Sequence, residues 1–142
     1  MKYIVLLMTA TILVGSCQYK KTSSINPPLA TVVKVNAAEA FMDFEEAKKY
    51  QDINEIYSKV DKQNPEKAWK EMVTFFYNLS KDKKFTNQWK YYNYDITENI
   101  NNKNAEVILK SKNKEALFQT ITYKLDLRQS VWIINDIEYT KK

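Results

Sequence analysis

The most reactive side chain in this sequence is that of its single cysteine, Cys17. Small residues come directly before it, and a mostly apolar run precedes them from Tyr3 to Val14, behind a basic second residue. A positive start, a short apolar segment and a small-residue cleavage site are typical of a secretory leader. A helix that crosses a bilayer needs about 20 apolar residues, and this run is shorter. We therefore expect residues 1–16 to be a signal peptide that is cleaved between Ser16 and Cys17.

The stretch Leu13-Val14-Gly15-Ser16-Cys17 resembles the lipobox of bacterial lipoproteins. The resemblance implies that Cys17 is lipidated, becomes the first residue of the mature protein and anchors it in a membrane. Lipidation consumes the thiol, the one strong nucleophile that the composition offers. Gln18 follows the cysteine, and residues 18–21 contain no acidic side chain. In lipoproteins this pattern implies a location in the cell envelope, at the outer membrane and facing the periplasm. The alternative is a free thiol beside an ordinary cleavage site.

Other chemistry is limited by composition. The chain has no histidine, which excludes Ser-His and Cys-His catalysis and most zinc chemistry. It has one glycine and no calcium-loop pattern, so we expect no metal site, no phosphate loop and no cofactor. All 17 acidic residues lie from Glu39 onward and four of the 22 basic residues precede it, so the rest of the chain carries a net charge of only +1. Nucleic acid is therefore not an expected partner.

After the leader we expect a lipidated, flexible tether over residues 17–30 and a single domain over residues 31–140. The tether is predicted from its serines and prolines and its low apolar content. In the first helix, predicted over residues 31–41, the apolar face is expected to consist of Val33, Ala37, Ala40 and Phe41.

A second helix is expected to begin at Asp43, which forms a capping-box pattern with Glu46, and to continue through a bend near Gln51. A third is expected to begin at Asn64, where a cap residue precedes a proline. These three helices make up the helical part of the predicted domain.

From residue 92 onward the apolar period changes from helical to alternating, which predicts four strands, over residues 92–96, 105–110, 117–127 and 131–139. The links between them are short and polar, as in an antiparallel meander. The predicted fold class is α+β, with three N-terminal helices packed on a curved four-stranded antiparallel sheet. The side chains expected to be buried together are Phe41, Phe44, Trp69, Phe76, Trp132 and Ile134.

Three short motifs, Asp43-Phe44-Glu45-Glu46-Ala47, Ala105-Glu106-Val107 and Trp132-Ile133-Ile134, resemble the nuclear transport factor 2-like superfamily, and specifically its small bacterial lipoproteins of unassigned function. The resemblance covers residues 31–140 and implies a cone-like domain with an internal cavity. Met42 departs from the family pattern, which usually has a small residue before the aspartate. The resemblance implies no activity, because the same cone serves enzymes, binders and structural modules.

On this cone we expect Tyr92, Tyr94 and Trp132 to line the cavity, although strand aromatics also fill ordinary cores. Asp95 could be a general base, as in the steroid isomerases that share the cone, but strand alternation points it away from Tyr94 and toward solvent. The expected function is a non-catalytic envelope module that binds a small apolar ligand or a protein partner. The alternatives are an isomerase- or hydratase-type enzyme with a buried carboxylate and a tyrosine, and an immunity or inhibitor protein.

Overall fold

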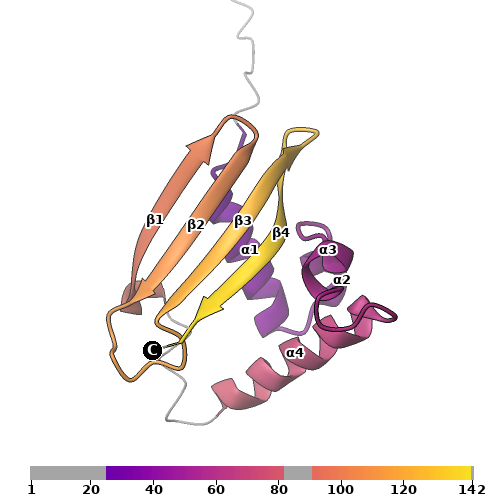
Figure 1. The fold of residues 1–142 in the computed structure, drawn as a ribbon, viewed down its shortest axis with the longest axis vertical. Coiled ribbons are helices and arrows are strands. Elements are labelled where there is room, and N and C mark those ends of the chain that lie inside the picture. The colour runs from indigo at the N-terminus through magenta and orange to yellow at the C-terminus, as the bar shows by residue number, and fades with distance from the viewer. Residues whose placement is uncertain (1–24, 82–90, 142) are drawn as a thin grey trace, which may run out of the picture.

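The computed structural model describes residues 25–81 and 91–141, without the side chain of Tyr92 (Figure 1). The predicted signal peptide, its cleavage site and Cys17 lie outside the described residues. Within them, the chain forms four helices followed by a short 3-10 turn and four strands. The elements are α1 (Pro28–Ala40), α2 (Phe44–Lys48), α3 (Ile53–Tyr57), α4 (Pro65–Ser80), η2 (Tyr91–Asn93), β1 (Tyr94–Asn101), β2 (Asn104–Ser111), β3 (Thr120–Arg128) and β4 (Val131–Thr140). None of the helices in the described ranges has the length and apolar content that crossing a membrane requires.

The four strands form one antiparallel sheet in the order β1-β2-β3-β4. The β1–β2 turn has Asn102 at positive φ, and the β3–β4 turn has both Gln129 and Ser130 there. Tight hairpin turns adopt positive φ because their backbone twist then matches that of the flanking strands. The predicted α+β class and the antiparallel meander are confirmed.

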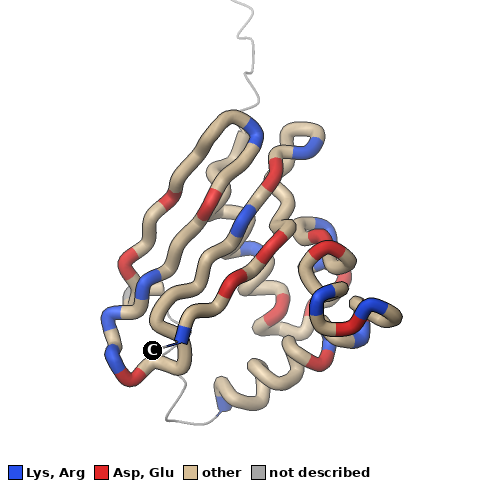
Figure 2. The backbone as a smooth tube through the Cα atoms, in the orientation of Figure 1, with Lys and Arg blue, Asp and Glu red and all other residues tan. Residues whose placement is uncertain are grey.

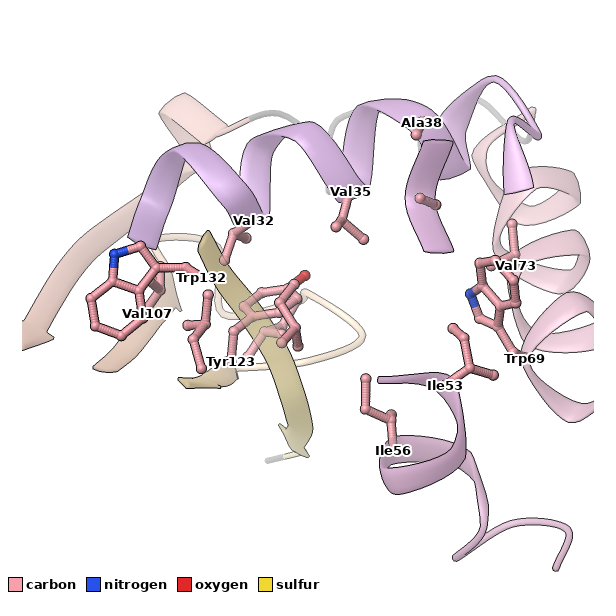
Figure 3. Close-up of a cluster of buried hydrophobic side chains, with 14 of the residues drawn as sticks. Val32, Val35, Ala38, Ile53, Ile56, Trp69, Val73, Val107, Tyr123 and Trp132 are labelled. Carbon is pink, nitrogen blue, oxygen red and sulfur yellow. The ribbon is translucent and has the colours of Figure 1, made fainter. Parts of the chain in front are cut away.

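In Figure 1, α1 runs behind the sheet and α2, α3 and α4 lie beside its β4 edge, and Figure 2 shows that all four strands carry charged positions. Along β2 and β3, buried residues alternate with more exposed ones. In Figure 3, Val32 and Val35 of α1 point toward Tyr123 of the sheet, while Trp69 of α4 closes the other side of the core. An antiparallel sheet that buries one face and exposes the other needs this alternation of apolar and polar residues. The core residues are Val32, Val35, Ala38, Ala47, Ile53, Ile56, Tyr57, Ala68, Trp69, Val73, Tyr94, Ala105, Val107, Leu109, Ile121, Tyr123, Leu125, Trp132 and Ile134.

The first helix differs from its prediction in start and in face. It begins at Pro28, three residues before its predicted start and inside the predicted tether, because proline suits the first position of a helix. Its buried side chains include Thr31, Val32, Val35 and Ala38, whereas all four residues predicted to face the core are exposed. Phe41 is 85% exposed, so its predicted place in the core is wrong. Both stripes have helical spacing, and contact with the sheet selects one of them.

The predicted second helix is two helices, α2 and α3, because the chain between them pairs with the sheet. Asp52 N donates to Ile134 O at 2.7 Å, and Ile134 N donates to Tyr50 O at 2.9 Å. An amide that bonds to a strand is not available for a helix, so the helix is interrupted there. The predicted N-caps are confirmed: Asp43 Oδ1 accepts from Glu46 N and Asn64 Oδ1 from Lys67 N. The reciprocal half of the capping box is not formed, because Asp43 N donates to Ala38 O instead.

The remaining predicted core residues lie at the interface of helices and sheet. Trp69, Trp132 and Ile134 are buried as predicted. Phe44 is half-buried and its ring meets that of Trp69 edge-on, at 5.2 Å between centroids. Phe76 is half-buried as well, in contact with the rings of Phe118 and Tyr139.

Candidate functional site

Two of the three residues predicted to line a cavity, Tyr94 and Trp132, are not brought together. Tyr94 is buried opposite Ser111, at one end of the sheet, while Trp132 is buried opposite Leu127, at the other end. The side chain of Tyr92 lies outside the described residues. Asp95 is exposed and 3.5 Å from Lys112 Nζ, which confirms that it faces solvent. It is therefore not placed as a buried base.

Trp132 does line a hollow, in which Thr31, Lys34 and Tyr50 also take part. The hollow measures about 150 Å³. Sites for small organic ligands usually measure about 300–1,000 Å³. The hollow beside Trp132 is thus too small for such a ligand without rearrangement.

A largely buried carboxylate that the sequence did not single out lies at the interface of the helices, at Glu39 on α1. Its Oε1 accepts a hydrogen bond from Trp69 Nε1 at 2.8 Å and another from Gln51 Nε2 at 2.9 Å. Burial raises the pKa of Glu39 above its ordinary value of 4.5, although the two donated hydrogen bonds act in the opposite direction. The carboxylate joins three segments of the chain: α1, the bridge before α3, and α4.

Tyrosine hydroxyls surround the same interior. Asn36, one turn before Glu39, donates through Nδ2 to Tyr91 Oη at 2.9 Å and to Tyr123 Oη at 3.1 Å. Burial raises the pKa of Tyr57 and of Tyr123, and the nearby charge of Glu39 raises both further. These phenols therefore remain neutral at physiological pH.

Tyr139 adds a fourth hydroxyl to this group. Although 37% of the residue is exposed, burial around its hydroxyl raises its pKa, and so do its interactions with Tyr57 and Glu39. Its ring contacts the rings of Phe76 on α4 and of Phe118. This interior therefore contains one carboxylate, four phenols and two side-chain amides, which belong to Glu39, Tyr57, Tyr91, Tyr123, Tyr139, Asn36 and Gln51.

One atom of this interior lacks a partner: Gln51 Oε1 is buried and accepts no hydrogen bond from the described residues. Sequence reasoning missed Glu39 because nothing near it resembles a catalytic motif. A signal was present, because Glu39 follows Val32 by seven residues and Val35 by four, which places it on the buried face of α1. A charged residue on the buried face of a helix is uncommon and points to a paired or functional group.

An open groove of about 720 Å³ lies between the α2–α3 region and the β3–β4 end of the sheet. Its apolar lining is Ile53, Val131 and Ile133, and Lys48 and Arg128 are among its charged residues. Its volume falls within the range of small-molecule sites, and its lining mixes apolar and charged side chains.

The charges of this groove are paired. Arg128 lies 2.8 Å from Asp52, 3.2 Å from Glu55 and 3.3 Å from Asp126, and Lys48 lies 2.8 Å from Glu66. The hydrogen bond from Arg128 lowers the pKa of Asp52. Among the described residues, no group of three or more Asp, Glu, Cys or His side chains is arranged to hold a metal ion.

Comparison of the chain with protein-family models, with curated proteins and with solved structures finds no match.

Proposed function

We propose that this protein is a lipid-anchored module of the cell envelope that binds another envelope protein and does not catalyse a reaction. The leader and the lipobox-like stretch that ends at Cys17 support the anchor. They also support a location outside the cytoplasm, at the periplasmic face of the outer membrane. The N-terminal lipid is then the contact with the membrane, and the folded domain is free to meet a partner.

The proposal includes the family resemblance and the cone-like fold. Helices that precede a four-stranded meander and cover one of its faces support both. In this domain the space under the sheet is occupied by Val35, Tyr123 and Trp69, which are at most 5% exposed. Because these side chains fill the interior, we expect a partner to bind at the surface of the domain.

The hydrogen bonds of Glu39 are the main support for a function without catalysis. Its carboxylate accepts from Trp69 and Gln51, two donors of the protein itself, so it acts as a structural link between three segments. A general base must instead lie within hydrogen-bond reach of the substrate proton that it removes. The enzyme alternative is supported by the raised pKa of Glu39 and the phenols around it, which are features of isomerase-type sites.

The groove beside β4 favours a protein partner over a small apolar ligand. Apolar side chains such as Ile133 lie there beside ion pairs such as Arg128–Asp52, and this mixture is typical of interfaces between proteins. An enclosed apolar ligand would need a large hollow without charges, and the one beside Trp132 measures about 150 Å³. An immunity or inhibitor protein would be one form of such a binder.

The anchor is tested by expressing the full gene in a bacterium and measuring the mass of the mature N-terminus and its partition into detergent. We expect a diacylated or triacylated Cys17 and loss of membrane association in Cys17→Ser. An unchanged mass and unchanged partition in that variant would refute the anchor.

The binding surface is tested by placing a photo-crosslinking amino acid at Ile133, in the groove, and at Thr97, on the outer face of β1, as the matched control. We expect an adduct of defined mass from position 133 in intact cells, and the same adduct from the Glu39→Gln variant. Adducts at both positions alike, or loss of the adduct in Glu39→Gln without unfolding, would contradict the proposal.

A further inference from the structure

One end of the domain combines the entry of the chain with two hairpin turns. In Figure 1 the start of α1 and the β1–β2 and β3–β4 turns lie together at the top. Lys103 O in the first turn accepts from Leu127 N at 2.7 Å, and Asn26 lines the same hollow as Ser130. We call this region the entry end and define it as residues 25–27, 100–104 and 129–131.

The entry end has an unusual surface composition. Ile25 is 47% exposed, Ile100 is 56% exposed and Val131 is 41% exposed. The three ranges also contain Lys103 and no acidic residue. The Glu98 carboxylate beside these ranges is held by Leu29 N, which donates to its Oε2 at 2.7 Å. Exposed apolar side chains together with a cation suit the boundary between head groups and acyl chains of an anionic bilayer.

The length of chain before the domain places this end near the membrane. Ile25 is eight residues along the chain from Cys17, and a fully extended segment of that length spans at most about 28 Å. A lipid on Cys17 therefore holds the entry end within about 28 Å of the bilayer. Lys20 and Lys21 lie within this connection and add attraction to anionic lipids.

We propose that the entry end rests on the membrane surface, with Ile25 and Ile100 in the head-group region. The proposal depends on the lipidation of Cys17. The membrane then contacts the protein at two places, the lipid and the entry end. This double contact gives the domain a defined orientation, with the β2–β3 connection pointing away from the bilayer.

The test uses the full mature chain, in which an acylated Cys17 leaves an introduced cysteine as the only free thiol. Lys103→Cys at the entry end and Lys114→Cys at the opposite end are labelled with the same environment-sensitive fluorophore. Each protein is placed in vesicles of phosphatidylethanolamine and phosphatidylglycerol that contain a spin-labelled lipid. We expect a blue-shifted emission and severalfold stronger quenching for the label at 103. Equal quenching at the two positions would overturn the proposal.

A second comparison isolates the apolar contact. In the Lys103→Cys background, the double substitution Ile25→Ser and Ile100→Ser should lower the quenching, whereas Val60→Ser, an exposed valine elsewhere, should leave it unchanged. The label at 103 could instead show self-quenching that rises with the density of protein on the vesicles and does not depend on the spin-labelled lipid. That result would overturn the proposal and assign this surface to contact with a second copy of the chain. A protein that stays on the vesicles with a water-exposed label at 103 refutes this inference alone, whereas release of the whole chain refutes the anchor.

Discussion

The hydrogen bond from Trp69 to Glu39 can be tested by Trp69→Phe, which keeps most of the buried ring and removes the donor. Trp69 is fully buried and its Nε1 lies 2.8 Å from Glu39 Oε1. Loss of a hydrogen bond to a charged group costs about 1.5–3 kcal/mol, apart from the packing lost with the smaller ring. Trp132→Phe is the matched control, because it shrinks a ring that is also buried, in a hollow without an acidic residue.

The difference between the two variants at pH 7 should therefore be about 1.5–3 kcal/mol in the free energy of unfolding, measured by urea denaturation. For a domain of this size the corresponding difference in Tm is on the order of 10 °C. Both variants should keep the far-ultraviolet circular dichroism of the parent. Equal destabilisation by the two substitutions would refute a specific role of the indole donor.

The difference should also depend on pH. Because the pKa of Glu39 is raised in the folded state, the fold binds the proton more tightly than the unfolded chain does. The stability tied to this group is then greatest at low pH and decreases as the pH rises from the unfolded value through the raised one. Without the indole donor the pKa of Glu39 rises further, so the deficit of Trp69→Phe should be largest at neutral pH and smaller in acid. A deficit that does not vary with pH would contradict this assignment.

Three further predictions concern the stability of the folded domain. Glu39→Gln should raise Tm at pH 7 and remove the decrease in stability that accompanies ionisation, in melts recorded across the acid range. Asn36→Ala should cost about 1–3 kcal/mol by denaturant unfolding, because it leaves the buried hydroxyl of Tyr123 without its partner. Trp132→Ala should cost about 3–5 kcal/mol, while Phe41→Ser should change the unfolding midpoint little, because Phe41 is 85% exposed; similar losses in the last two would show that the core is assigned wrongly.

Local sequence patterns determined much of the secondary structure. The cap at Asn64 followed by Pro65 predicts the start of α4, because a side-chain acceptor and a fixed φ both act within the first turn. The alternation in β2 and β3 predicts which side chains are buried, because successive residues of a strand point to opposite faces. Both are short-range effects, so they can be predicted from neighbouring residues alone.

The tertiary structure decided the rest through contacts between distant segments. The first helix is apolar on more than one face, so only its packing on the sheet could select Val32 and Val35 over Val33 and Phe41. The candidate site is equally non-local, because the partners of Glu39 lie 12 and 30 residues further along the chain. A carboxylate is buried and its pKa raised only when such segments meet around it, and no pattern confined to one helix specifies that meeting.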